Sequence, residues 1–160
     1  KFKERRFTCP SIACRGWFIS WQPFRESNCP AVAETVDGVW HFNYMYKYTR
    51  KVGVHVDGVP DNLAVFKRGC LSAEVLELPD GRKYPLQYVT DEKNQDPPLY
   101  GYRFRTEAGE EFISYEDTDY CDVVNIVNIH PAAANIPETP WIVMLGLYDF
   151  MLRQVEGHIV

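Results

Sequence analysis

The chain has 160 residues, of which 46% are hydrophobic and 24% charged, and its formal net charge is −5 at pH 7. A chain of this length buries roughly 68–70% of its unfolded surface, so we predict one folded domain over residues 1–160 rather than a disordered chain. The negative charge argues against a general nucleic-acid binder, because affinity for phosphate backbones comes mostly from clustered Lys and Arg. Aromatic residues make up 14% of the chain, with ten Tyr and nine Phe, and this surplus favours β-sheet.

Short runs of strand-forming residues follow one another, separated by turn signals. Asp-Gly occurs at 37–38, 57–58 and 80–81 and Ala-Gly at 108–109, which are typical hairpin turns. Apolar and polar residues alternate within several runs, so we predict antiparallel sheet that closes into a barrel or packs as a sandwich. In chain order, the strands are predicted at 17–21, 42–48, 52–56, 63–66, 71–78, 84–88, 102–106, 111–115 and 123–129. The polar stretch 90–98 is expected to be the longest exposed loop.

One helix is predicted near the C-terminus, at about residues 140–153. Thr139 is a plausible N-cap, and Pro140 suits the first helical position, where its missing N–H costs nothing. The run 141–152 is apolar on nearly every face, so we expect protein to surround it on all sides. This run is shorter than the roughly 20 residues of a transmembrane helix and contains Asp149, so we do not predict a membrane span.

This combination of a many-stranded antiparallel sheet and a final apolar helix resembles the tubby-like C-terminal fold, which includes phospholipid scramblases and LURP-one-related proteins. Residues 143–151, Val-Met-Leu-Gly-Leu-Tyr-Asp-Phe-Met, are similar to the terminal helix of scramblases. The resemblance implies a closed antiparallel β-barrel threaded by the buried C-terminal helix. It also implies a non-enzymatic domain that binds anionic phospholipid, such as a phosphoinositide, at a membrane surface, or that serves as a protein-interaction module.

One departure from the scramblase pattern precedes the helix. Scramblases place an acidic, calcium-binding-like segment there, whereas residues 130–138 of this chain contain a single acid. Calcium-triggered lipid scrambling is therefore not expected.

The resemblance also suggests where a lipid headgroup would bind. Tubby proteins hold phosphoinositide headgroups with Lys and Arg on the barrel surface, and the matching candidates here are Lys47, Arg50 and Lys51 near a strand end. Phosphate requires such donors close together. The alternative for these residues is an ordinary solvated hairpin end. Two further basic pairs are weaker candidates of the same kind: Lys67-Arg68 and Arg82-Lys83.

No recognisable catalytic motif occurs in the sequence, so we expect no enzyme activity. The sequence contains no Gly-x-Ser-x-Gly, Cys-plus-His or Ser-Lys arrangement in a recognisable context. An acid/base pocket around His41, with Tyr44, Tyr46 and Glu34, is the nearest candidate. In a regular strand, however, His41 faces away from the two tyrosines.

Metal and cofactor sites are not predicted either. The acidic residues between Glu110 and Asp122 lack the spacing of a calcium loop. Cys9, Cys14 and Cys29 lack the close pairs and the fourth ligand of a structural zinc site, although His41 could supply one ligand.

The five cysteines are an odd number, and we favour reduced thiols in a cytoplasmic or nuclear protein over a disulfide framework. We expect a monomer that associates peripherally with a membrane. The first residue is Lys rather than Met, so we expect that the N-terminus has been trimmed or processed.

A second family offers an alternative. Gly38-Val39-Trp40 is similar to the Gly-x-Trp that opens the first strand of lipocalins, which are barrels that bind a small hydrophobic ligand. A lipocalin keeps its barrel hollow and packs an amphipathic helix outside. The apolar run 141–152 favours the filled barrel instead.

Overall fold

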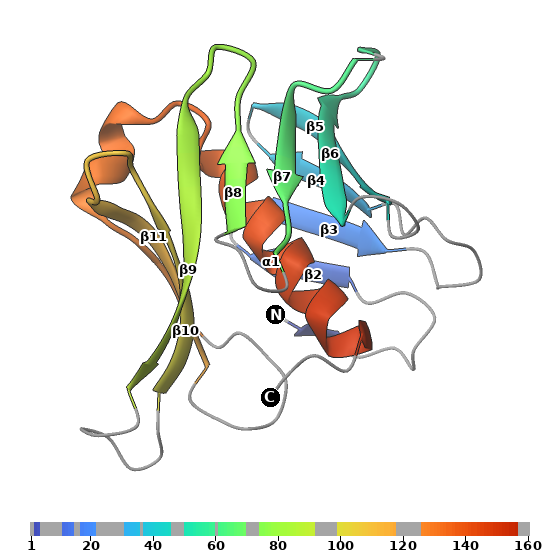
Figure 1. Ribbon diagram of the computed structural model, residues 1–160. Coiled ribbons are helices and arrows are strands. Elements are labelled where there is room, and N and C mark those ends of the chain that lie inside the picture. The colour runs from blue at the N-terminus through green and yellow to red at the C-terminus, as the bar shows by residue number, and fades with distance from the viewer. Residues whose placement is uncertain are drawn as a thin grey trace. The chain divides into compact units, whose positions relative to one another are not determined.

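The computed structural model is mainly β, with antiparallel strands and a C-terminal α-helix (Figure 1). It describes residues 2–3, 11–14, 17–21, 31–35, 37–45, 50–59, 61–69, 74–91, 99–117 and 126–156. The chain divides into two compact units, an N-terminal unit, Lys1–Arg82, and a C-terminal unit, Lys83–Val160. The prediction of a mainly antiparallel β protein is confirmed. The pairings of the described strands do not close either unit's sheet on itself, so the closed barrel and the single domain stay predictions.

The N-terminal unit contains a sheet in which every described strand pairs antiparallel with the next one along the chain. This order follows from hairpin turns, such as the Asp-Gly turn at 57–58, where Gly58 adopts φ +78°. The strands are β1 (Phe2–Lys3), β2 (Ser11–Cys14), β3 (Trp17–Trp21), β4 (Ala31–Thr35), β5 (Gly38–Met45), β6 (Lys51–Val56), β7 (Ala64–Lys67) and β8 (Glu74–Glu77).

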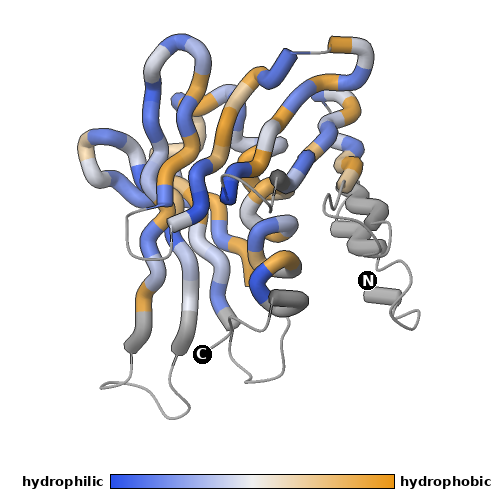
Figure 2. The backbone as a smooth tube through the Cα atoms, turned by 45° about the vertical axis from the view of Figure 1, so that its right-hand side comes forward, coloured by the Kyte–Doolittle hydropathy of each residue, from blue (hydrophilic) through white to orange (hydrophobic). Residues whose placement is uncertain are grey.

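The two faces of β5–β7 differ sharply in burial. Phe42, Val52, Val54 and Phe66 are fully buried on one face, which we call the inner face. The residues that alternate with them are mostly half-buried and polar, and they form what we call the outer face. Figure 2 shows hydrophobic and hydrophilic residues alternating along the strands, as predicted for a sheet with one covered face.

The C-terminal unit contains a second antiparallel ladder, followed by the helices. Its elements are β9 (Lys83–Asp91), β10 (Leu99–Arg105), β11 (Glu111–Asp117), β12 (Ile126–Ile129), a 3-10 helix η1 (Pro131–Asn135) and α1 (Thr139–Glu156). The strands pair β9 with β10, β10 with β11 and β11 with β12. The start of the predicted loop 90–98 was wrong, because residues 90 and 91 belong to β9; residues 92–98 lie outside the described ones.

A β-bulge interrupts the pairing of β10 with β11. Phe104 lies opposite Ile113, whereas Arg105 lies opposite Glu111, so Phe112 is the extra residue. Phe112 and Ile113 are both fully buried, although they are neighbours in a strand. The bulge therefore turns Glu111 to the face opposite Ile113 and Tyr115.

The predicted apolar helix is present and buried. Every residue from Trp141 to Phe150 is buried, and α1 continues three residues past the predicted end at 153. The N-cap prediction was wrong in detail: Ile142 N–H donates to the Glu138 carbonyl, and the Thr139 hydroxyl donates to the Ile136 carbonyl (2.7 Å) instead of accepting from the helix. In the part of the chain that the structure describes, no helix has the length and hydrophobicity of a membrane span.

Candidate functional site

The predicted headgroup residues lie before and at the start of β6. Arg50 is exposed and adopts φ +48°, a left-handed conformation that is uncommon for a residue other than glycine. Lys51 is the first residue of β6 and is half-buried. Lys47 lies outside the described residues. Among the described residues, neither Arg50 nor Lys51 has an ion-pair partner.

The strand register brings a second basic pair to the same place. Lys67, the last residue of β7, lies directly opposite Lys51, and the Arg68 N–H donates to the Arg50 carbonyl at 2.9 Å. We call these four residues, Arg50, Lys51, Lys67 and Arg68, the basic cluster. The sequence identified both pairs as candidates but gave no sign that they meet, because 16 positions separate Lys51 from Lys67.

The members of the basic cluster have different surroundings. Lys67 forms an ion pair with Glu77 of β8 at 2.5 Å, with 43% of the Lys side chain exposed. The Arg68 guanidinium lies 4.9 Å from the centroid of the Tyr44 ring, a cation–π contact. The Arg68 guanidinium therefore packs on the inner face, whereas Arg50 and Lys51 are the members of the cluster best placed to meet a ligand.

A histidine pair lies further along the outer face. His41 of β5 and His55 of β6 are direct cross-strand partners, with ring centroids 4.9 Å apart and ring planes 7° apart. His41 Nε2 is 3.1 Å from Asp57 Oδ1, and Asn43 Nδ2 is 3.4 Å from His55 Nδ1. Burial, and then the neighbouring His41, lower the pKa of His55, and Asp57 acts in the opposite direction.

This pair corrects the suggested pocket around His41. As the alternation predicted, His41 lies on the face opposite the buried Tyr44, and its ring meets His55 instead. Tyr46 lies outside the described residues. The sequence contained one usable signal for the pair, since residues equidistant from a hairpin turn become cross-strand partners.

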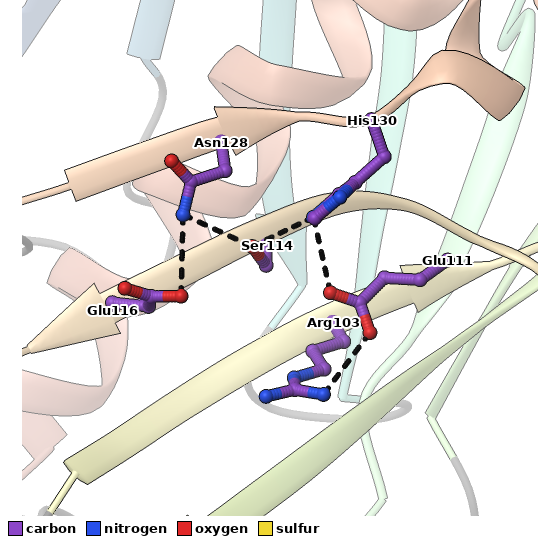
Figure 3. Close-up of polar contacts among 6 residues, drawn as sticks. All are labelled: Arg103, Glu111, Ser114, Glu116, Asn128 and His130. Atoms are coloured by element: carbon purple, nitrogen blue, oxygen red, sulfur yellow. Dashed lines mark hydrogen bonds and ion pairs between the residues drawn. The ribbon is translucent and has the colours of Figure 1, made fainter.

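A polar network covers the outward side of β10–β12 in the C-terminal unit (Figure 3). His130 Nε2 lies 3.0 Å from Ser114 Oγ and 3.1 Å from Glu111 Oε1, and Glu111 also pairs with Arg103 at 3.1 Å. Asn128 Nδ2 donates to Glu116 Oε1 at 3.2 Å. The sequence did not suggest this network, because the β-bulge is what turns Glu111 toward His130.

Ser114, His130 and Glu111 do not form a nucleophilic triad in this arrangement. A triad needs the serine on one imidazole nitrogen and the carboxylate on the other. Here both contact the same atom, Nε2, which must carry a proton to face a carboxylate. That nitrogen cannot accept the serine proton, and Ser114 is only 1% exposed. The network suits a structural role better than acyl transfer.

The remaining candidates divide between structural roles and undescribed residues. Glu111 and Glu116 of the acidic run belong to the polar network, and among the described residues no three His, Cys, Asp or Glu side chains converge as metal ligands. Of the cysteines, Cys14 alone falls in a described strand, β2. The lipocalin-like triplet has a structural explanation: Gly38 follows the β4–β5 turn with φ +137°, and Trp40 donates to Thr35 Oγ1 at 3.1 Å.

Comparison with known protein families, with curated proteins and with solved structures finds no match to this chain. The class of protein is therefore defined by its antiparallel β architecture with a buried C-terminal helix.

Proposed function

We propose that this chain binds anionic phospholipid headgroups through the basic cluster, with Arg50 and Lys51 as the principal contacts and Lys47 beside them. The observation that carries this proposal is the register that sets Lys51 opposite Lys67. Two like charges directly opposite each other on neighbouring strands destabilise a sheet. Glu77 offsets the charge of Lys67 in the free protein, and a bound phosphate would offset the charge of Lys51 in the same way, because its oxygens accept from several cationic donors.

The backbone of Arg50 supports the same proposal. A non-glycine residue at φ +48° costs conformational energy, and such costs concentrate at functional sites. The conformation holds the Arg50 carbonyl on the Arg68 N–H while the exposed Arg50 side chain stays available to solvent.

We also propose that the domain is tubby-like, non-enzymatic and monomeric, with α1 inside a closed barrel, and that it works at a membrane surface in the cytoplasm or nucleus. The support for the threaded helix is the burial of every residue from Trp141 to Phe150. A helix packed on the outside of a hollow barrel would keep a polar face toward solvent. The buried α1 therefore favours this fold over a lipocalin-like carrier.

Vesicle flotation tests the proposed function directly. Wild type should float with phosphatidylcholine vesicles that contain phosphatidylinositol bisphosphate and remain behind with phosphatidylcholine alone. Removing two charges near the membrane in Arg50→Ala/Lys51→Ala should weaken binding by about 2 kcal/mol, roughly 30-fold, and adding Lys47→Ala should weaken it further. Added salt should reduce wild-type binding, since exposed charges are screened.

The chain offers a matched control. Arg82→Ala/Lys83→Ala removes the same net charge at a different pair, where Arg82 is engaged by Asp80 at 2.6 Å. This control should float like wild type. If the Arg50, Lys51 and Lys47 substitutions together leave flotation unchanged, the headgroup site is wrong.

A further inference from the structure

Resting on the proposed function, we infer that the His41–His55 pair makes anionic-lipid binding depend on proton uptake, so that the outer face of β5–β7 recognises an extended anionic surface at acidic pH.

The histidine pair lies on the same face of the sheet as Lys51 and Lys67. In β6, His55, Gly53 and Lys51 alternate with the buried Val52 and Val54, so the three lie on the outer face. The rows across the sheet are His41 with His55, then Asn43 with Gly53, then Lys51 with Lys67. A flat anionic surface over these rows would meet the histidines and the lysines together.

The hydrogen bond from Asn43 describes the unprotonated state of the His55 Nδ1 atom. Asn43 Nδ2 donates to His55 Nδ1, which can accept only when that nitrogen is unprotonated. His41 Nε2 lies against the Asp57 carboxylate, which would form an ion pair with a protonated ring. Each ring is half-buried, so both can exchange protons with solvent.

The stacked arrangement opposes charging both rings in the free protein. Two imidazolium rings with centroids 4.9 Å apart repel each other, and burial together with His41 lowers the pKa of His55. An anionic surface would reduce this repulsion. By thermodynamic linkage, a surface that promotes protonation is itself bound more tightly after protonation, by the same factor.

The other charged groups around the outer face determine how much the protonation of His41 and His55 would change its net charge. They are Glu34 on β4, Arg50 and Lys51 at the start of β6, Asp57 and Asp61 between β6 and β7, Lys67 on β7 and Glu77 on β8, whereas the Arg68 guanidinium lies on the Tyr44 ring of the inner face. Four acids face three cations in this set when the histidines are neutral, and Glu77 already engages Lys67. Protonation of both rings offsets the excess acid, so the positive potential of the basic cluster extends along the sheet.

The spacing indicates a surface rather than a single headgroup. His55 and Lys51 are four positions apart in one strand, which corresponds to about 13 Å at roughly 3.3 Å per residue. Between them the Asn62 side chain covers Gly53. One phosphate cannot contact both ends of this span, whereas neighbouring lipids in a bilayer can.

The test measures binding at two pH values to phosphatidylcholine vesicles that contain phosphatidylserine. Between about pH 7.5 and about pH 5.5, the range in which histidine titrates, wild-type affinity should rise roughly 30-fold for two added charges. His41→Gln/His55→Gln should lose most of this rise while keeping wild-type affinity at the higher pH. Calorimetry in buffers of different ionisation enthalpy should show proton uptake on binding by wild type and not by the double variant.

Two controls separate this inference from the proposed function. His130→Gln changes a histidine of the C-terminal unit and should keep the full pH dependence. Soluble inositol hexakisphosphate, with several phosphates but no surface, should bind the wild type and the double histidine variant with the same pH dependence. Circular dichroism at both pH values checks that each variant is folded.

The outcomes are distinct. If wild type binds at the higher pH through Arg50 and Lys51 but the double histidine variant retains the pH-dependent rise, the proton coupling is wrong and the proposed function stands. If inositol hexakisphosphate shows the histidine-dependent rise, the extended surface is wrong. If wild type binds neither vesicle type at either pH, the proposed function itself fails.

Discussion

The ring of Tyr115 occupies the space beside Gly146 in α1, where a side chain would otherwise stand. Its hydroxyl donates to the Val143 carbonyl at 3.0 Å and to the Ile142 carbonyl at 3.2 Å. A Cβ at position 146 would meet the hydroxyl and two ring carbons of Tyr115 closer than van der Waals contact allows. The strand β11 and the helix α1 are therefore fitted together at one point inside the C-terminal unit.

Gly146→Ala should destabilise the protein even though alanine is the better helix former. The gain in helix propensity is about 1 kcal/mol. Forcing a methyl group against the Tyr115 ring, which its hydrogen bonds fix in place, typically costs about 1–3 kcal/mol or more. Urea denaturation should therefore show a net loss of stability. In a Tyr115→Leu background the ring is gone, and the same substitution should be neutral or stabilising. An equal loss in both backgrounds would contradict the proposed fit.

Tyr115 should also make stability depend on alkaline pH. Burial, together with the nearby Asp149, raises the pKa of Tyr115 well above its ordinary value of 10.0. Above about pH 10 the unfolded chain releases this proton while the folded chain retains it, so stability declines as pH rises toward the folded pKa. Denaturation at several alkaline pH values should show a steeper decline for wild type than for Tyr115→Phe. Parallel declines in the two proteins would mean that Tyr115 ionises equally in both states.

Local sequence patterns predicted the strands and the helix, but they did not predict which side chains meet at the candidate sites. The alternation around Phe42 and Tyr44 predicted which face is buried, and the apolar run 141–152 predicted a buried helix. Alternation fixes the face of a residue and not its partner on the next strand. The position of Lys51 opposite Lys67 and the stacking of His41 on His55 both depend on the strand register, which the turns determine.

The polar network of the C-terminal unit shows a second reason why the candidate sites could not be predicted from the sequence. Strict alternation along β11 would place Glu111 on the same face as Ile113 and Tyr115. The bulge at Phe112 reverses that assignment and brings Glu111 to His130. Nothing in the residue pattern of 111–117 marks the bulge, so the network could not be predicted before the structure.

Leu145→Asp tests the burial of the helix. Leu145 is fully buried, and a carboxylate at this position would be an unpaired charge in the core, which should lower the free energy of unfolding by several kcal/mol. We expect little or no soluble, folded protein, whereas the volume-conserving Leu145→Met should cost less than about 1.5 kcal/mol. Soluble expression followed by cooperative thermal unfolding of Leu145→Asp would mean that the helix is peripheral.

His55 should weaken the fold in acid. Its folded pKa lies below the ordinary value of 6.5 because of burial and the neighbouring His41. The unfolded chain therefore binds this proton more readily, so stability falls as pH drops through and below about 6.5. His55→Gln should lose less stability than wild type between about pH 7 and about pH 5 in urea denaturation. Anionic vesicles should reduce the wild-type loss, and an unchanged acid sensitivity in the variant would assign the effect to other groups.

Asp149 and Arg153 should be strongly coupled energetically. Asp149 is 2% exposed, and its Oδ2 accepts from Arg153 Nε at 2.8 Å across one helical turn, while the Arg153 guanidinium lies 5.0 Å from the Tyr102 ring centroid. Arg153→Met leaves a buried carboxylate without this cation and should cost about 3–5 kcal/mol. The double variant Asp149→Leu/Arg153→Met removes both charges and should be more stable than Arg153→Met alone. Denaturation of the wild type, both single variants and the double variant gives the coupling energy, and additive losses would show that the two charges stabilise the helix independently.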